Sequence, residues 1–264
     1  MNILNSDNNW HHQLSLALSN NEIECHFFLE DKFHFLKVDQ YLIIHLVNLN
    51  NKFVAEELTT LQENYRKKNI KLVHLWEDLW QSRPIQVLAR IKSLLGRNIR
   101  IHGRKTKAFR ITKPVSDLFL TQNHLQGPVS SRYKIGLFEK EELVAVATFS
   151  ALRKMNHTEN YRSAELIRFA VKSGYSITGG LSKLIAYFSE MHKPDDLMTY
   201  ADRDWSAGEA YSKLGFIQTS IIEPHTYILD ENLNRQLKKD HQVLGEEVFN
   251  TGSLKFILRF NGSV

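Results

Sequence analysis

The sequence predicts a mixed α/β (α+β) protein built from two domains. Segments with strand-like and helix-like periodicity alternate along most of its 264 residues. A strongly basic stretch without clear periodicity, RNIRIHGRKTKAFRI at 97–111, separates two complete series of such segments. An order of strand, glycine-containing loop, helix, strand, helix and strand spans residues 164–222. We therefore expect domains at 1–103 and 104–264, joined by a linker near 97–110.

The first domain is predicted to alternate strands with helices. Val, Ile, Leu and aromatic residues dominate the expected strands, while apolar residues recur at three- and four-residue spacing in the expected helices. Pro84 suits the first turn of a helix, and Gly96 suits its end. Helices are expected at 10–20, 55–69 and 83–95, and strands at 23–29, 33–38, 41–49 and 71–77.

The second domain is predicted to begin with a short helix capped by Ser116. Two antiparallel strands with a charged turn follow in YKIGLFEKEELVAVATFS, and the alternation in the final FNTGSLKFILRF suits an edge strand. Further strands are expected at 163–172, 196–203 and 215–223, and helices at 181–192 and 207–214.

Composition narrows the class of protein. The hydrophobic fraction of 42% and the charged fraction of 24% are those of a globular protein with a real core. No apolar run approaches the roughly 20 residues of a membrane helix, and the N-terminus lacks the features of a signal peptide. We expect a cytoplasmic protein without membrane partners. Cys25 is the only cysteine, which excludes an internal disulfide and a cysteine-based zinc site.

The chain carries a formal net charge of +5, which suits a polyanionic partner such as DNA. The basic stretch supplies Arg104, Lys105 and Lys107 as candidate contacts to a phosphate backbone. Many proteins this basic bind no nucleic acid, and a solvated connector explains the stretch equally well. The sequence leaves the oligomeric state open.

A phosphate site is predicted where the loop GYSITGG meets the following helix. A helix start presents unpaired backbone N–H groups and a positive dipole end, which suit a pyrophosphate. Gly179 and Gly180 would let the backbone approach such a ligand closely. The alternative is a simple turn.

The string YSKLGF, after a strand and a short helix, resembles the closing motif of the GNAT (Gcn5-related N-acetyltransferase) superfamily. The resemblance implies a GNAT-like fold, acetyl-CoA or another acyl-CoA as donor, and Tyr211 near the coenzyme A thiol. It also implies that the loop binds the pyrophosphate of the coenzyme. Ser176 departs from the family pattern, which has Gln or Arg there. The implied cofactor-binding residues are Ser176, Ile177, Thr178, Gly179, Gly180 and Ser182.

A narrower resemblance covers residues 120–216. The strings NHLQG, AELIRFAV, GGLSKLIAYF and TYADRDWSAGEAYSKLGF are similar to phage-encoded GNAT-like proteins, among them the Mom proteins, which modify adenine in DNA. In that comparison His124 and Asp202 match polar residues of the proposed active site. Imidazole suits proton transfer near neutral pH, and Asp202 ends a strand at the edge where open α/β sheets bind ligands.

We therefore expect His124, Asp202 and Tyr211 to share one cleft, with Arg203 and Trp205 able to clamp a phosphate or stack on a base. Each residue also has a structural interpretation. His124 could bond the backbone, Asp202 and Arg203 could form a turn or an ion pair, and Trp205 and Tyr211 could be packed in the core.

The string RKKNIKLVHLWEDLWQSRPIQVLARIKSLLG resembles the very-short-patch-repair-like branch of restriction-endonuclease folds. An active nuclease of this kind needs several acidic side chains to hold a divalent metal. Asp39 could be the first acid, but His45 stands where the next is expected. The resemblance thus implies a degenerate domain without a metal site or nuclease activity. The alternative is a small α/β domain with packing duties only.

Three functions remain open from the sequence. The first is a GNAT-like group-transfer enzyme that acts on DNA, by base modification or by acyl transfer. The second is a non-catalytic DNA-binding protein of phage or mobile-element origin. The third is a homing-endonuclease-like nuclease, which the missing acids around His45 disfavour.

Overall fold

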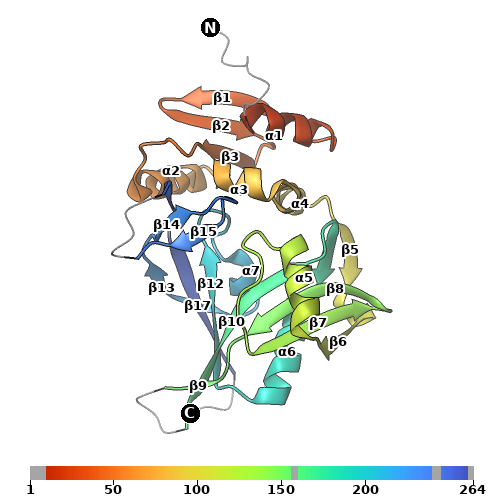
Figure 1. Ribbon diagram of the computed structural model, residues 1–264. Helices are drawn as coiled ribbons and strands as arrows, with labels where there is room; N and C mark the ends of the chain where they lie inside the picture. The colour runs from red at the N-terminus through yellow and green to blue at the C-terminus, as the bar shows by residue number, and fades with distance from the viewer. Residues whose placement is uncertain (1–9, 156–159, 240–244, 261–264) are drawn as a thin grey trace. The chain divides into compact units, whose positions relative to one another are not determined.

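The computed structural model describes residues 10–155, 160–239 and 245–260, and the chain forms two compact units (Figure 1). Unit 1 comprises Met1–Leu95, Asp202–Ala207 and Ile222–Ser253, and unit 2 comprises Gly96–Ala201, Gly208–Ile221 and Leu254–Val264. The chain leaves unit 1 after Leu95 and returns to it twice. The predicted domains, 1–103 and 104–264, are each one continuous segment of the chain. The two units of the structure are each made of three segments, so their residues differ from those of the predicted domains. As independently folding parts they stay a prediction.

Unit 1 contains a four-stranded sheet in the order β1-β2-β3-β4, antiparallel except for the parallel pair β3 and β4. All six residues of β3 (LIIHLV) are buried. The helix α2 begins where Glu57 accepts the Val54 N–H at 3.1 Å, and it ends on basic residues that suit the helix dipole. The elements are α1 (Trp10–Ser19), β1 (His26–Glu30), β2 (Phe33–Lys37), β3 (Leu42–Val47), α2 (Ala55–Lys67), β4 (Lys71–Trp76), α3 (Glu77–Ser82) and α4 (Pro84–Leu94).

A three-stranded sheet from the C-terminal part of the chain completes unit 1, with the order β15-β14-β16. Its strands are β14 (Thr226–Leu229), β15 (Arg235–Leu237) and β16 (Glu247–Phe249). Leu229 and Val248 from this sheet pack with Val47, Leu58 and Trp76 in one apolar cluster. Burial of these side chains joins segments more than 150 residues apart in the sequence.

Unit 2 is built around an eight-stranded sheet in the order β13-β17-β12-β10-β8-β7-β6, with β9 also paired to β10. A separate parallel pair joins β5 to β11. The elements are β5 (Ile99–His102), β6 (Thr106–Arg110), α5 (Lys113–Asn123), β7 (Tyr133–Glu139), β8 (Glu142–Phe149), β9 (Arg153–Lys154), β10 (Arg162–Val171), β11 (Tyr175–Thr178), α6 (Gly180–His192), β12 (Asp196–Asp202), α7 (Glu209–Ser212), β13 (Ile217–Ile222) and β17 (Ser253–Arg259).

The two longer helices of unit 2, α5 and α6, pack against different apolar clusters of its sheet. Leu184 and Phe188 of α6 belong to the main cluster, where the Phe188 ring stacks on Phe149 at 4.1 Å between centroids. Phe119 and Leu120 of α5 form a smaller cluster with Val146 and Ala170 of the sheet. Neighbouring residues of a strand point to opposite faces of the sheet. A strand residue in the cluster of α6 therefore points to the face covered by α6, and one in the cluster of α5 points to the face covered by α5.

The α/β class and the predicted hairpin at 23–38 are confirmed. Four expectations were wrong. Ser116 does not cap α5, because the helix begins at Lys113 after Thr112 and Ser116 lies inside it. The final strand β17 is not an edge strand, because it lies between β13 and β12. The other two concern strands that were not expected. The stretch 97–111, predicted to lack regular structure, contains β5, a 3₁₀ turn at Gly103–Lys105 and β6. The predicted loop 174–180 contains the strand β11. In both places the strand is held by pairing with a distant segment, which local periodicity does not reveal. Among the described residues, no helix has the length and apolarity needed to cross a bilayer.

Candidate functional site

The central feature of unit 2 is a pair of parallel strands that separate. The ladder between β10 and β12 covers only Ser163–Glu165 and Asp196–Met198, although both strands continue (Figure 1). At the next position the Thr199 hydroxyl donates to the Leu166 carbonyl at 3.0 Å. A side chain therefore satisfies the backbone acceptor at the point where the ladder ends.

A β-bulge lies at the same point of β10. Leu166 pairs with Phe149 of β8, and Arg168 pairs with its neighbour Thr148, so that Ile167 is the extra residue. Leu166 belongs to the cluster under α6, whereas Ala170 belongs to the cluster under α5. Alternation before and after the bulge thus puts both Glu165 and Arg168 on the α5 face. Without the bulge, two residues three positions apart would face opposite sides.

The guanidinium of Arg168 is satisfied by backbone carbonyls, since it donates to Gly127 at 3.3 Å and to Ile167 at 3.0 Å. The Glu165 carboxylate is one-fifth exposed and lies 3.6 Å from a guanidinium nitrogen of Arg153. Burial, and next the charge of Glu165, raise the pKa of the Tyr200 hydroxyl. Glu165 and Tyr200 are therefore electrostatic neighbours where β10 and β12 separate.

Along the chain, β10 leads through β11 to the start of α6. Gly179 precedes the helix with φ of 75°, and it has no side chain to cap the first N–H groups. A Cβ built on Gly179 would meet no atom within 4 Å, so the space beside it is open. The positive end of a thirteen-residue helix is thus accessible to an anion.

A basic turn packs directly against this helix start. A Cβ on Gly103 would lie 2.9 Å from the Thr178 carbonyl oxygen, so only glycine permits the contact. The Lys183 ammonium donates to the carbonyl of Gly103 at 3.0 Å and to that of Thr106. The next residues of the turn, Arg104 and Lys105, are exposed. Two cations thereby stand beside the loop that the sequence singles out for pyrophosphate.

The parallel pairing of β5 with β11 adds a third cation. Arg100 stands in register with Ser176, and His102 with Thr178. Residues in register on paired strands project to the same face. The position at which this sequence has Ser176 instead of Gln or Arg therefore has an exposed arginine on the neighbouring strand.

His124 is the residue that follows α5, and it caps a turn. Its Nδ1 accepts the backbone N–H of Gln126 at 3.0 Å, and the Gly127 N–H donates to its carbonyl at 3.1 Å. With Nδ1 accepting, the neutral ring carries its proton on Nε2. This arrangement matches the structural interpretation of His124, and its part in catalysis stays a prediction.

Tyr211 lies on the short helix α7 and packs on two aromatic rings. Its centroid is 5.5 Å from that of Phe216 and 5.7 Å from that of Phe256. Tyr211, His124 and Glu165 all belong to unit 2. The ring is only partly buried, so its packing and a role for its hydroxyl are compatible.

Asp202 belongs to unit 1, together with Arg203 and Trp205. Asp202 accepts the Asp204 N–H at 3.0 Å and so shapes the turn after β12. Arg203 lies 3.9 Å from the Glu63 carboxylate, and Trp205 is 5% exposed. A buried indole offers no free face to a base, so Trp205 fits the packing interpretation. The convergence of Asp202 with His124 and Tyr211 stays a prediction.

Glu165 was not expected as a catalytic residue, and Arg100 was expected only as one of the basic residues that could contact DNA phosphates. An acid in the apolar strand AELIRFAV was the available signal for Glu165, since a half-buried carboxylate is uncommon. Its position beside a bulge could not be read locally. No sequence signal marked Arg100 apart from its basic neighbours.

The residues expected at a nuclease centre do not form one. Asp39 is exposed in the turn after β2, and His45 is fully buried among aromatic rings. In the described part of the chain, no three His, Cys, Asp or Glu side chains gather as metal ligands would.

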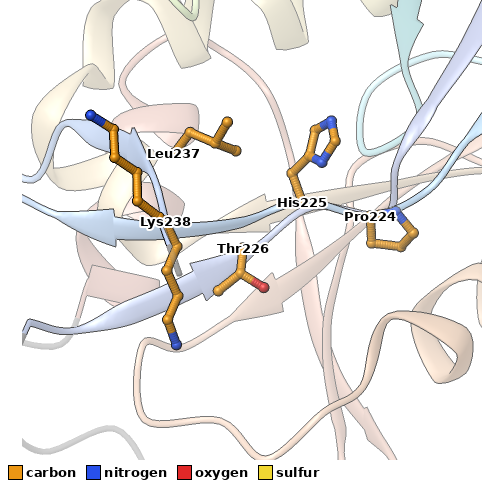
Figure 2. A pocket seen from close by; sticks show the side chains of 6 residues that line it. Pro224, His225, Thr226, Leu237 and Lys238 are labelled. Atoms are coloured by element: carbon orange, nitrogen blue, oxygen red, sulfur yellow. The ribbon is translucent and has the colours of Figure 1, made fainter. Parts of the chain in front are cut away.

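Two cavities among the described residues are lined by side chains of unit 1. The larger, of about 350 Å³, lies between Pro224–Thr226 and Leu237–Lys239 (Figure 2). Its Lys238 is already paired with Glu247 at 2.6 Å. The smaller, of about 270 Å³, lies beside β2 and β3.

No protein-family model matches the chain, and no curated protein matches it. Solved structures of GNAT acetyltransferases cover about 60% of it. The ribosomal-protein-S18-alanine N-acetyltransferase from Escherichia coli is 16% identical over 60% of this chain and 96% of its own, with a TM-score of 0.40. A GNAT family acetyltransferase from Elizabethkingia anophelis with acetyl-CoA bound is 13% identical over 59% of this chain and 99% of its own, with a TM-score of 0.36. A chain of the NatC complex bound to Gag peptide and CoA is 12% identical over 60% of this chain and 99% of its own, with a TM-score of 0.37. Likeness at this level concerns the path of the backbone and does not identify a substrate.

Proposed function

We propose that unit 2 transfers an acyl group from an acyl-CoA donor to an amine. The observation that carries the proposal is the separation of β10 from β12 next to an uncapped, glycine-led helix start. Separating strands leave backbone groups for a ligand to pair with, and the helix start favours an anion. Acyl-CoA combines both features, because a chain with amide groups follows its pyrophosphate.

The residues around the helix start fit the phosphates of such a donor. The N–H groups of the first turn of α6 and the exposed Ser182 hydroxyl would donate to the pyrophosphate. Arg100 and Arg104 add positive charge on the adjoining segments. Arg100 would take the part that Gln or Arg has in the family loop. The bound donor would supply an activated thioester carbonyl.

On the acceptor side, Glu165 is the residue we propose as proton acceptor. It is largely buried and lies on the α5 face where the strands part. A carboxylate there could take the proton from an attacking amine. Tyr211 would then protonate the departing thiolate. His124, whose Nδ1 is engaged by the backbone, would act through its Nε2 proton as a hydrogen-bond donor.

We propose DNA as the partner that carries the acceptor amine. The formal charge of +5 and the exposed cations Arg104, Lys105 and Lys107 support this choice. So does the resemblance of residues 120–216 to proteins that modify adenine. The same cations cannot serve donor and DNA phosphates at once, so competition between coenzyme A and duplex DNA would reveal which ligand they contact.

A matched pair of glycine variants tests the donor site. Gly179 and Gly96 both have left-handed backbones, with φ of 75° and 70°, and both have open space around a built Cβ. Aspartate tolerates this conformation. In Gly179→Asp the new carboxylate would occupy the helix start and repel phosphates, so titration calorimetry should show coenzyme A affinity reduced by about tenfold or more. Gly96→Asp should bind like the parent. Absence of coenzyme A binding by the parent chain would refute the proposed function.

The acceptor is tested by mass spectrometry of DNA from cells that express the protein. Nucleosides are searched for a new mass that is absent with Glu165→Gln. If purified protein releases coenzyme A thiol only when peptides or small amines are added, the DNA part of the proposal is wrong while acyl transfer stands.

A further inference from the structure

Unit 1 contains a cavity that the proposed acyl transfer does not use. It has a volume of about 270 Å³ and lies where β2 and β3 meet the segment leading to α2. Its walls combine basic, amide and apolar side chains. The lining residues are Lys32, His34, Leu46, Asn48, Asn50, Asn51, Lys52 and Phe53.

The charged side chains that line this cavity are all lysines. No acidic side chain lines it, while two lysines do. Lys32 is bridged to Glu57, which does not line the cavity, and its ammonium lies 5.3 Å from the centroid of the Phe53 ring in the cavity wall. Lys52 is exposed, and no carboxylate pairs with it in the described structure. An anion would therefore meet a cation without having to displace an acid.

The amide groups of the wall are oriented by hydrogen bonds on their outer sides. Asn48 Oδ1 accepts from Trp10 Nε1 at 2.8 Å and from His11 Nε2 at 2.9 Å, which leaves the Asn48 NH₂ as a donor. Asn51 closes the turn by donating to the Asn48 carbonyl and accepting the Phe53 N–H. The cavity wall is therefore preorganised, and the groups it has left to offer are mainly donors.

One further group of the wall lacks a partner. The Nδ1 atom of His34 is buried, and no described residue forms a hydrogen bond with it. A buried polar atom without a partner costs roughly 1–3 kcal/mol, so a hydrogen bond gained by a small movement of the His34 ring would stabilise the wall. This observation is independent of the charge of the lining.

We propose that this cavity binds a phosphoryl group. Phosphate has several strong acceptor oxygens and negative charge, which match ammonium and amide donors in a site without carboxylates. The volume suits a phosphate with part of the group it is attached to, and Phe53 supplies an apolar wall. The phosphoryl group comes either from a free phosphate ester or from the backbone of DNA. The absence of acids among the lining residues also separates this cavity from a metal-dependent nuclease centre.

The full-length protein and three variants test the proposal. Asn50→Asp places a negative charge in the lining without changing shape, and Lys52→Met removes a cation while keeping the side-chain length. Lys37→Met is the control, because Lys37 is exposed at the end of β2 and does not line the cavity. Circular dichroism confirms that each variant is folded.

The probes are inorganic phosphate and AMP by titration calorimetry, and a short labelled duplex by fluorescence anisotropy. For a free phosphate ester, Asn50→Asp and Lys52→Met should weaken binding of AMP by about tenfold or more. For DNA, only duplex binding should fall, and Lys52→Met should lower the salt slope by about one. Lys37→Met should match the parent in every assay. If no probe binds, or if all three variants bind equally, the proposal is wrong. Acyl-transfer activity at saturating donor serves as a separate readout, because Asn50 and Lys52 lie outside the proposed donor and acceptor sites and the activity should not change in these variants.

Discussion

Nδ1 of His45 lies 3.0 Å from Nδ1 of His74, and both imidazoles are fully buried in unit 1. Nε2 of His74 is 3.1 Å from the Leu58 carbonyl, which only accepts, so this nitrogen carries the His74 proton. Nδ1 of neutral His74 is then the acceptor, and His45 donates to it. Burial is the main cause that lowers the pKa of His45 to about 2 and that of His74 to about 4.

Unit 1 should lose stability in mild acid. The folded pKa values of His45 and His74 lie below the ordinary 6.5, so their contribution is complete above about pH 6.5 and declines as the pH falls toward 4. Each histidine should cost about 2 kcal/mol between pH 6.5 and about 5. Urea unfolding followed by tryptophan fluorescence at several pH values measures this. His45→Phe should bind about one proton fewer on unfolding, whereas exposed His12→Gln should leave the slope unchanged.

An arginine at position 176 should be able to replace Arg100 in binding coenzyme A. Arg100→Gln removes the cation in register with Ser176 and should weaken coenzyme A binding by about tenfold, as expected for a lost charged hydrogen bond. Adding Ser176→Arg to that variant restores an arginine on the same face and should recover most of the affinity. Titration calorimetry with coenzyme A decides. Failure of the second substitution to improve binding would separate Arg100 from the phosphate site.

Glu165→Gln should slow catalysis without loss of donor binding. Loss of a general base typically reduces the rate by about 100-fold or more, while the phosphate contacts at α6 remain intact. The acid limb of the pH–rate profile, which reports ionisation of the base, should also disappear. Glu190→Gln on the exposed side of α6 is the matched control. Steady-state kinetics that show an unchanged acid limb in Glu165→Gln would reassign the base.

The ion pair between Asp78 and Arg235 should stabilise unit 1 strongly. Arg235 donates to both carboxylate oxygens of Asp78, at 2.7 and 2.9 Å, and the Asp78 side chain is 2% exposed. Asp78→Ala should lower the free energy of unfolding by about 3 kcal/mol, because it leaves a largely buried guanidinium unpaired. Adding Arg235→Ala should cost less than the sum of the single changes.

The exposed pair of Lys238 and Glu247 is the comparison. Glu247→Ala should cost less than about 1 kcal/mol, because water screens exposed charges. Thermal and urea unfolding measure both pairs. If Asp78→Ala and Glu247→Ala lowered the free energy of unfolding equally, the buried pair would not be what stabilises the packing of α3 against the C-terminal sheet.

Periodicity predicted the elements whose signal is local. The strand LIIHLV and the helix at 181–192 present long apolar patterns, and both form as expected. β11 and β5 were missed because each is short and exists through pairing with the other, some 75 residues away. Whether two distant segments pair depends on contacts between them and on the entropy of closing the loop that joins them. Neither can be read from the residues of one segment alone.

The sequence by itself determined the α/β class, the glycine at the helix start and the absence of acids around His45. Only the tertiary structure decided that Arg100 stands beside Ser176 and that a bulge turns Glu165 and Arg168 to one face. It likewise assigned Asp202 and residues 222–253 to unit 1. The physical reason is the same in each case. Side-chain type is local information, whereas register, bulges and burial depend on which distant segments pair and exclude water together.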